Sequence, residues 1–359
     1  MAIGAGQNRS MSSSLPPTLS RRTLLGRGTV VLLPAFGGLA ACRAVPEGPK
    51  QRHLSLQAHR GGRGLAPENT LAAFDHAMTL GVDTLELDIG LTADGVAVIS
   101  HDTALNPDHT RDAQGRWLSA TGPAIHQLTL AQLKTYDVGR LNPNTKYGQQ
   151  FPAQVPRDGE RIPTLAELFA LADRRGASRM NFNIETKVDP TRPADTASPE
   201  AITDAILAEA RRAGRLHHVT LQSFDWRSLV YAETREPRLW RAWLTSPRTV
   251  QDSRWTAGLR LADHGGSVPR LVDAASRRGK GLSIWSPAFG DLQPQQVKEA
   301  HDLDLKVLPW TVNDPADMAR LIDMGVDGII TDYPDRLRAV MFERDIPLPD
   351  ALPARPAST

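Results

Sequence analysis

Beyond residue 50, short apolar runs alternate along the chain with longer amphipathic segments. Each apolar run is bounded by Gly, Pro or charged residues, which is typical of buried strands. The predicted strands are 54–59, 83–90, 96–100, 180–187, 219–224, 239–245, 281–287, 306–313 and 327–334. Between most of these strands, apolar residues recur at the spacing of an amphipathic helix. The predicted helices are 69–81, 164–176, 199–214, 269–279 and 314–325.

The order of these elements predicts the fold class. Repeated strand–helix units indicate an α/β protein with a parallel sheet, and so many units favour a (β/α)8 TIM barrel over an open doubly wound sheet. The predicted strands outnumber the eight places of such a barrel by one, and residues 92–95 are too few for a crossover helix. We therefore expect irregularity around the second and third strands, through a missing helix or a hairpin. Asn69 is expected to cap the first helix and Gly81 to end it.

One long segment interrupts the strand–helix alternation. Residues 103–162 are rich in Pro, Gly, Asn and Asp and show no clear repeat. In a barrel, an insertion that follows a strand lies over the catalytic face, so this segment is expected to form a lid or a wall of the substrate site. We accordingly predict a single barrel domain over 53–345 that contains this insertion, followed by a Pro-rich tail over 346–359.

Composition places the chain among ordinary globular proteins, with 40% hydrophobic and 23% charged residues over 359 positions. The formal net charge of +2 comes from the first 41 residues, which contain four arginines and no acidic residue. The rest of the chain is slightly acidic and has no basic block. This charge pattern argues against a nucleic acid as the main partner. Nothing in the sequence implies a protein partner.

The N-terminus has the features of a bacterial export signal. Arg21 and Arg22 precede an apolar stretch over 28–41, which is shorter than the roughly twenty residues of a spanning helix. Residues 1–41 therefore resemble a twin-arginine signal peptide, with 42–52 as a linker. The sole cysteine, Cys42, ends the sequence LAAC, which resembles the lipobox of lipoproteins. We expect an exported protein, either periplasmic or anchored to a membrane through lipidated Cys42; the alternative is cleavage after Ala44, which would discard this cysteine.

Polar residues at the ends of four predicted strands are the candidates for chemistry. These residues are His59 and Arg60, Glu86 and Asp88, His101 and Asp102, and Glu185 and Lys187. In a barrel, catalytic groups belong at the carboxyl ends of the strands. Glu86 and Asp88 are two positions apart, so their side chains leave the strand on the same face, as do those of Glu185 and Lys187.

Three carboxylates from two strands would repel one another unless a cation lies among them. Oxygen ligands suit Ca2+ or Mg2+ better than zinc, so Glu86, Asp88 and Glu185 predict a site for one divalent cation. The alternative is a buried ion network in which these acids pair with Arg60 and Lys187. The presence of two histidines at neighbouring strand ends favours the metal site over that network.

Six motifs together resemble the glycerophosphodiester phosphodiesterase family, which is related to the phosphatidylinositol-specific phospholipases C. In chain order, these motifs are AHRGGRGLAPENTLAAF, LELDIGLTADGVAVISHD, NIETK, LQSF, PWTVN and GVDGIITDYP. The resemblance extends from about His59 to Pro334. It implies a (β/α)8 barrel and the hydrolysis of a glycerophosphodiester to sn-glycerol 3-phosphate and an alcohol.

The resemblance also implies roles for individual residues. These are His59 and His101 as the acid–base pair, Glu86, Asp88 and Glu185 as metal ligands, and Arg60 and Lys187 as groups that face the phosphate. The residue types suit the chemistry, because imidazole titrates near neutral pH and cations offset the charge that develops on a phosphodiester. Trp310 lies near the end of the predicted strand 306–313, beside Thr311 and Asn313, and is interpreted either as a wall for the substrate or as a core residue.

Some residues and functions carry less support from the sequence. Glu68 is interpreted as a charge favoured by the start of a helix, Asp102 as a residue that orients a loop, and the remaining histidines receive no role. A phospholipase-D-like or phospholipase-C-like enzyme acting on lysophospholipids is an alternative function. That enzyme would need an apolar or basic rim, and 103–162 contains no basic amphipathic helix. A non-catalytic lipoprotein that binds phosphate or sugar would not need both His59 and His101.

Overall fold

The structure is a computed structural model that describes residues 53–276 and 282–354. The predicted signal peptide over 1–41 and the linker over 42–52 lie outside the described residues, as does the end of the predicted tail, 355–359.

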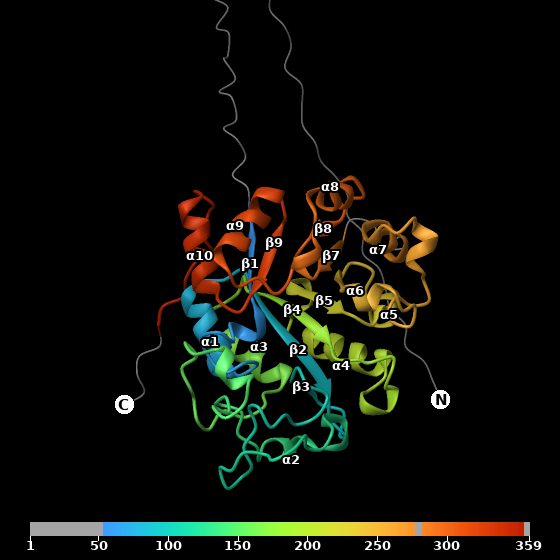
Figure 1. Ribbon diagram of the computed structural model, residues 1–359. Helices are drawn as coiled ribbons and strands as arrows, with labels where there is room; N and C mark the ends of the chain where they lie inside the picture. Colours follow the sequence, from blue (N-terminus) through green and yellow to red (C-terminus); the bar gives the residue numbers. More distant parts are fainter. Residues whose placement is uncertain (1–52, 277–281, 355–359) are drawn as a thin grey trace, which may run out of the picture. The chain divides into compact units, whose positions relative to one another are not determined.

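Eight parallel strands form one sheet, in the order β8-β7-β6-β5-β4-β2-β1-β9 (Figure 1). The strands are β1 (Ser55–Ala58), β2 (Thr84–Leu91), β4 (Asn181–Thr186), β5 (Val219–Ser223), β6 (Trp240–Thr245), β7 (Ser283–Pro287), β8 (Lys306–Val307) and β9 (Gly328–Thr331). The helices of the repeating units are α1 (Leu71–Leu80), α3 (Leu165–Arg174), α4 (Pro199–Arg212), α5 (Trp226–Arg235), α7 (Val268–Ser276), α8 (Pro294–Asp302), α9 (Pro315–Met324) and α10 (Pro334–Glu343). A short helix, α6 (Pro247–Val250), follows β6.

Backbone hydrogen bonds between β9 and the segment around β8 close the sheet into a barrel. Asp327 N–H donates to Val307 O at 2.9 Å and Ile330 N–H donates to Pro309 O at 3.1 Å. Further along the same seam, Val312 N–H donates to Ile330 O at 3.0 Å. The prediction of a (β/α)8 barrel is therefore confirmed. The predicted strand over 306–313 was too long, because the ladder of β8 ends at Val307 and the residues after it make only separate backbone hydrogen bonds to the neighbouring strands.

The ninth predicted strand forms a hairpin with its predecessor. β3 (Ala97–Ile99) pairs antiparallel with β2, with Ile99 opposite Ile89, and it lies off the path of the barrel sheet. The turn between these strands includes Gly95 at φ 77°, a left-handed conformation that glycine adopts without strain. The irregularity expected at the second and third strands is thus a hairpin, which leaves β2 and β4 as direct parallel neighbours.

The two faces of β2 show how the sequence pattern builds the site. Leu85, Leu87 and Ile89 are fully buried in the large apolar cluster that joins the sheet to the surrounding helices. Glu86 and Asp88 alternate with them and therefore lie on the inner face of the barrel. Burial of the three apolar side chains, at about 1.5–3 kcal/mol each, fixes this register and with it the direction of the carboxylates.

The barrel interior has an apolar side and a polar side. Ala242, Ile284, Leu308 and Ile330 form an apolar cluster on strands β6 to β9 and the segment after β8. On the opposite side, Asn183 Nδ2 donates to Gln57 Oε1 at 2.9 Å and to Gln222 Oε1 at 3.0 Å. Gln222 Nε2 in turn donates to Glu86 Oε1 at 2.5 Å, so this row of amides leads directly to the carboxylates.

The first helix begins one residue later than predicted. Thr70, rather than Asn69, is the N-cap of α1, and Thr70 Oγ1 accepts a hydrogen bond from Ala73 N–H at 3.1 Å. Asn69 has a left-handed backbone at φ 57°, which asparagine tolerates better than most residues, and its side chain turns toward the barrel mouth. Gly81 ends the helix as predicted, with its N–H donating to Ala77 O at 3.1 Å.

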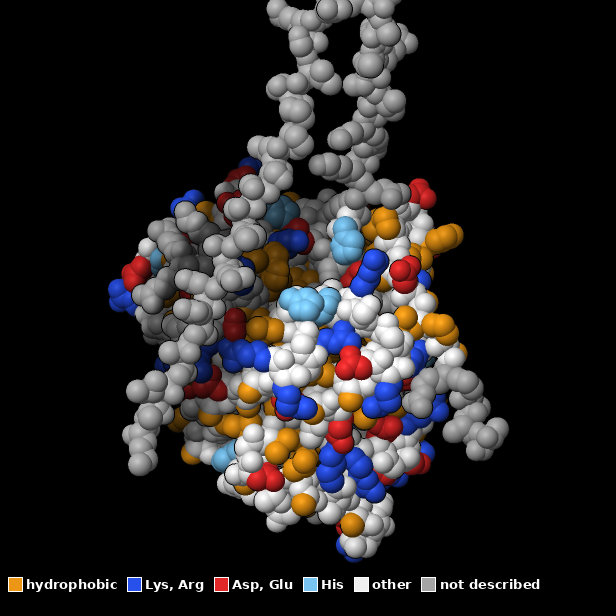
Figure 2. Space-filling model, turned by 180° about the vertical axis from the view of Figure 1, so that it is seen from behind, with side chains coloured by type: hydrophobic (Ala, Val, Ile, Leu, Met, Phe, Trp, Pro, Cys, Tyr) orange, Lys and Arg blue, Asp and Glu red, His pale blue; other side chains and the backbone are white. Residues whose placement is uncertain are grey.

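Residues 103–162 lie beside the carboxyl ends of β2 and β3, in the teal and green part of Figure 1. The segment has its own small apolar cluster with Val98, which includes Leu105, Ile125, Leu133 and Val138. Within residues 103–162, all of which the structure describes, the only α-helix is α2 (Leu130–Leu133). On the face of the molecule shown in Figure 2, basic and acidic side chains are interspersed. None of the helices in the described residues has the length and apolar character needed to cross a membrane.

Candidate active site

Glu86, Asp88 and Glu185 converge at the carboxyl ends of β2 and β4. The two strands pair in register, with Asp88 opposite Glu185, and one carboxylate oxygen from each of the three residues lies within 4.8 Å of the others. All three side chains are buried. The spacing deduced from strand alternation therefore brings these three oxygens together in space.

The arrangement of these carboxylates fits a hard divalent cation. Burial and the neighbouring carboxylates raise the pKa values of Glu86 and Glu185 above the ordinary range of a carboxylic acid. Asp88 Oδ1 is buried and accepts no hydrogen bond within the described structure, so it is available as a ligand oxygen. Oxygen-only donors of this kind are what Ca2+ and Mg2+ prefer.

Two cations also lie against the carboxylates, as the ion-network interpretation predicted. Lys187 Nζ is 2.7 Å from Glu185 Oε1 and 3.5 Å from Asp88 Oδ1, and Arg60 Nε is 3.4 Å from Asp88 Oδ2. Despite burial, which would favour the neutral acid, Lys187, His101 and Arg60 lower the pKa of Asp88. The cations stabilise one of the three carboxylates as an anion, whereas the pKa values of the other two remain raised.

His59 lies in the turn directly after β1 and is held by a carboxylate from the other end of the chain. Its Nδ1 is 2.6 Å from Asp332 Oδ1, and Asp332 follows the last strand, β9. Its Nε2 lies 4.0 Å from Glu86 Oε2. Burial lowers the pKa of His59, and Asp332 opposes that effect. Because Asp332 occupies Nδ1, Nε2 is the nitrogen left to face a substrate.

His101, two residues beyond β3, has the same kind of partner. Its Nδ1 is 2.9 Å from Asp102 Oδ1. The other oxygen of Asp102 lies 3.3 Å from His109 Nε2 and accepts from Asn106 Nδ2 at 2.7 Å. Burial, followed by the charges of Arg60 and Lys187, lowers the pKa of His101 to about 4. Asp102 therefore fixes the ring of His101 as well as the loop that follows it.

Arg60 contacts three acidic residues, namely Asp88, as given above, Glu86 and Glu68. Its backbone N–H donates to Glu86 Oε2 at 2.9 Å, and its Nη1 donates to Glu68 Oε1 at 2.7 Å. Arg60 has φ 52°, and the adjacent Gly61 has φ 79°, with the site of a Cβ only 2.8 Å from Ala73 Cβ. The glycine next to Arg60 thus permits the tight turn that brings the guanidinium and the start of α1 together.

The inserted segment reaches the site through Tyr147. The hydroxyl of Tyr147 donates to Glu68 Oε2 and accepts from Arg63 Nη1 at 3.0 Å. Arg63 Nε also donates to Asp332 Oδ1 at 2.7 Å. Burial would raise the pKa of Glu68, but Arg60, His109 and Arg63 lower it to about 2. Glu68 is therefore an ionised, buried part of the site rather than only a charge at the start of a helix.

These groups surround a cavity of about 140 Å³ at the barrel mouth. Its lining includes His59, Arg60, Arg63, Glu86, His101, Glu185, Gln222, Phe224 and Trp310. Trp310 Nε1 donates to Ser286 O at 2.9 Å, and its ring packs edge-to-face against Phe224 with centroids 5.3 Å apart. Trp310 thus forms one wall of the cavity. Lys187 lines a second, adjoining cavity.

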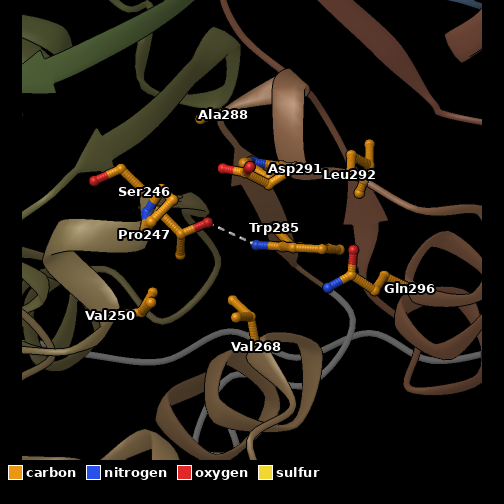
Figure 3. A pocket seen from close by; sticks show the side chains of 11 residues that line it. Ser246, Pro247, Val250, Val268, Trp285, Ala288, Asp291, Leu292 and Gln296 are labelled. Carbon is orange, nitrogen blue, oxygen red and sulfur yellow. Dashed lines mark hydrogen bonds between the residues drawn. The ribbon is translucent and has the colours of Figure 1, made fainter.

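A separate apolar pocket of about 80 Å³ lies between the ends of β6 and β7 and helix α7 (Figure 3). Trp285 forms its floor and donates from Nε1 to Thr245 Oγ1 at 2.8 Å. Asp291 is its one ionisable lining residue among those described, and none of the residues proposed for chemistry lines it. This pocket therefore does not take part in the site described above.

Comparison with known proteins places this site in a family. The model of the "Glycerophosphoryl diester phosphodiesterase family" matches residues 59–336, which include every strand end described above. The chain belongs to this family. A glycerophosphodiester phosphodiesterase of Caldanaerobacter subterraneus subsp. tengcongensis is 32% identical over 280 residues, which cover 78% of this chain and 94% of that one. A second relative, a glycerophosphodiester phosphodiesterase of Bacillus subtilis, is 30% identical. The aligned region covers 79% of this chain and 85% of the relative.

Solved structures agree with this membership. A candidate glycerophosphoryl diester phosphodiesterase from Silicibacter pomeroyi is 36% identical, has a TM-score of 0.74 and covers 83% of this chain and 96% of its own. A phosphodiesterase of Oleispira antarctica, solved with its product sn-glycerol-3-phosphate, is 25% identical and has a TM-score of 0.58. The match covers 80% of this chain and 96% of that one.

In this member of the phosphodiesterase family, the structure adds site residues that sequence analysis missed. Asn69 Nδ2 donates to Asp88 Oδ2 at 2.9 Å, and Gln222, Asp332, Tyr147 and His109 make the contacts given above. Gln222 and Asp332 stand at strand ends, as the catalytic candidates do, so strand position could have identified them. No sequence pattern marks Tyr147 or His109, because both lie in the irregular segment 103–162.

Proposed function

We propose that this phosphodiesterase hydrolyses glycerophosphodiesters to sn-glycerol 3-phosphate and an alcohol, with one Ca2+ or Mg2+ ion bound by Glu86, Asp88 and Glu185. The observation that carries the proposal is the convergence of these carboxylates with two histidines around one cavity. The substrate class follows from family membership and from the product bound to the Oleispira antarctica relative.

Charge is the main requirement of the reaction, because the phosphodiester gains negative charge on its non-bridging oxygens in the transition state. A divalent ion held by Glu86, Asp88 and Glu185 would supply positive charge there. Arg60, which lines this cavity, and Lys187, which lines the adjoining one, add two further cations next to the carboxylates. Tyr147 and Glu68 hold Arg60 in place from the side of the inserted segment.

His59 and His101 are proposed as the proton-transfer groups. One removes a proton from the attacking oxygen and the other protonates the departing alkoxide, and each transfer contributes typically ~10²–10⁴-fold. Both rings are fixed through Nδ1, by Asp332 and by Asp102 respectively, which leaves Nε2 for the substrate. Burial lowers the pKa values of both rings, which favours the neutral, basic form that the proton-removing histidine needs.

Metal removal tests the proposal most directly. Dialysis of the full-length protein against EDTA should abolish turnover of glycerophosphodiesters, and added Ca2+ or Mg2+ should restore it. Glu86→Gln removes one ligand charge and should reduce turnover by more than 100-fold at every metal concentration. The control Glu209→Gln changes a partly exposed carboxylate on α4 that pairs with Arg212, outside both cavities, and should retain full activity. Full activity of the metal-free protein would refute the metal assignment, and absence of turnover in the metal-loaded protein would leave only a binding function.

A further inference from the structure

A second cavity of about 430 Å³ adjoins the catalytic cavity at the barrel mouth. The two cavities share four lining residues: His101, Glu185, Phe224 and Trp310. The outer cavity is completed by residues that follow β4 and β6, including Asp189, Arg192, Arg248 and Trp255. Because a phosphate near Glu185 lies at the junction of the two spaces, one of its two ester substituents must extend into the outer cavity.

The larger size of the outer cavity suits the variable alcohol of the diester, and the smaller inner cavity suits the glycerol, which is common to all its substrates. The charges around the outer cavity then determine which alcohols it accepts. Electrostatic complementarity of this kind contributes to selectivity even where it adds little affinity.

The acidic residues of the outer cavity, apart from the metal-site residue Glu185, already have partners. Asp102 is bonded to two histidines and Asn106, as described above. Asp189 accepts from the backbone N–H and the hydroxyl of Thr191 at 2.8 and 2.6 Å, and from Arg192 Nε at 3.2 Å. The oxygens of both carboxylates are therefore already engaged in hydrogen bonds within the protein, and Asp189 is also paired with a cation.

Arg248 differs from these residues because no carboxylate in the described part of the chain forms an ion pair with it. It lies in α6, is exposed, and its guanidinium carbon is 5.9 Å from the ring centroid of Trp255. A quaternary ammonium group binds favourably over an aromatic face, but Arg248 already lies over the ring of Trp255 and would repel such a group. Arg248 thus adds a positive charge to the cavity, and within the described residues no carboxylate pairs with it.

We infer that the outer cavity receives the leaving alcohol and that Arg248 selects alcohols bearing an anionic group, either a phosphate or a carboxylate. This inference rests on the proposed function, because it names the substrate class of the same site. The guanidinium would form charge-assisted hydrogen bonds with the anionic group as the diester binds.

The experiment compares kcat/KM for four diesters that differ in the charge of the alcohol. Glycerophosphocholine is cationic, glycerophosphoglycerol is neutral, and the diesters of glycerol phosphate and of glycerate carry a phosphate and a carboxylate. At low ionic strength, the metal-loaded protein should prefer the anionic diesters to glycerophosphocholine by about tenfold, and this preference should weaken with added salt because Arg248 is exposed. Comparison of the phosphate-bearing diester with the carboxylate-bearing diester shows which anionic group Arg248 prefers.

Variants of Arg248 make the result specific to this residue. Arg248→Gln should bring the anionic diesters down to the rate of glycerophosphoglycerol, and Arg248→Glu should reverse the order in favour of glycerophosphocholine. The control Arg254→Gln removes an exposed arginine that is paired with Asp252 and does not line the cavity, so the order of preference should remain.

The outcomes separate the inference from the proposed function. Turnover of all four diesters at rates that do not depend on charge, or an unchanged preference in both Arg248 variants, would overturn the inference and leave the proposed function intact. Failure of the metal-loaded protein to cleave any of the four would refute the proposed function itself.

Discussion

At the scale of single residues, Asp332 connects three side chains at the barrel mouth. Its Oδ1 accepts from Arg63 and contacts His59 Nδ1, and its Oδ2 accepts from Asn313 Nδ2 at 2.7 Å. Burial alone would raise its pKa, but His59 and Arg63 lower it, so the carboxylate is ionised. A buried anion in this place fixes both the orientation and the tautomer of His59.

Asp332→Asn should therefore reduce kcat by about 10²–10⁴-fold, the range of a lost proton-transfer group, with a much smaller change in KM. The amide retains the shape of the side chain but no longer compensates the proton on His59. Steady-state kinetics with a glycerophosphodiester would measure both constants. The control Asn313→Ala removes a neutral partner from the opposite oxygen and should cost less than tenfold in kcat. Equal losses in the two variants would show that Asp332 acts only as a structural hydrogen-bond acceptor.

At the scale of elements, sequence periodicity predicted the strands and helices well where burial is regular. The alternation of β2 predicted both its apolar outer face and the convergence of Glu86, Asp88 and Glu185, because side-chain direction in a strand follows from position alone. The short link over 92–95, which has no room for a crossover helix, predicted the irregularity that the structure shows as the hairpin of β2 and β3. Side-chain direction along a strand and the length of a link both follow from residue spacing, which can be read from a single sequence.

Features that depend on contacts between distant segments were not predicted. Asn69 was expected to cap a helix, but a hydrogen bond to Asp88 holds its side chain at the barrel mouth instead. The strand after 306 was expected to be longer, but only Lys306 and Val307 enter the ladder. Tyr147 lies 79 positions from its partner Glu68, and no periodic pattern links such residues.

Tyr147 permits a test of the contribution of the inserted segment. Tyr147→Phe removes the hydroxyl that binds both Glu68 and Arg63, so the two side chains should lose their fixed positions around Arg60. We expect KM to rise by about tenfold, because one hydrogen bond to a charged group contributes roughly 1.5 kcal/mol, while kcat changes little. The control Tyr136→Phe changes a tyrosine that packs in the apolar cluster of the same segment. Unchanged kinetics in Tyr147→Phe would show that the segment does not organise the cations.

At the scale of the whole molecule, the barrel depends on close packing where β9 joins β1 and β8. Gly328 begins β9, and a Cβ placed there would lie 2.6 Å from Ser55 O and 2.9 Å from Leu308 Cδ1. Gly328→Ala should therefore destabilise the fold by about 1–3 kcal/mol, the usual cost of overpacking. Urea unfolding followed by circular dichroism would measure the loss. Gly290→Ala, at a position with open space around it, should leave the midpoint unchanged.

The N-terminus bears on where the molecule works, and we propose that it directs export and lipidation. Replacing Arg21 and Arg22 by Lys should leave an unprocessed precursor in the cytoplasm, because a receptor reads the arginine pair. Cys42→Ser should release a soluble form from the membrane fraction. Fractionation and immunoblotting would follow both variants. Membrane association that persists in Cys42→Ser would show that this cysteine is not an anchor.

The contact between His59 and Asp332 joins residues 273 positions apart, one directly after the first strand and the other directly after the last. A chain that still lacks its final strand therefore has His59, the proposed proton-transfer residue, with no carboxylate to orient it. Catalytic competence would then arrive late in folding, after the two ends of the barrel have met. Appearance of activity during refolding would therefore report on closure of the barrel, because partly folded chains would be unable to cleave diesters.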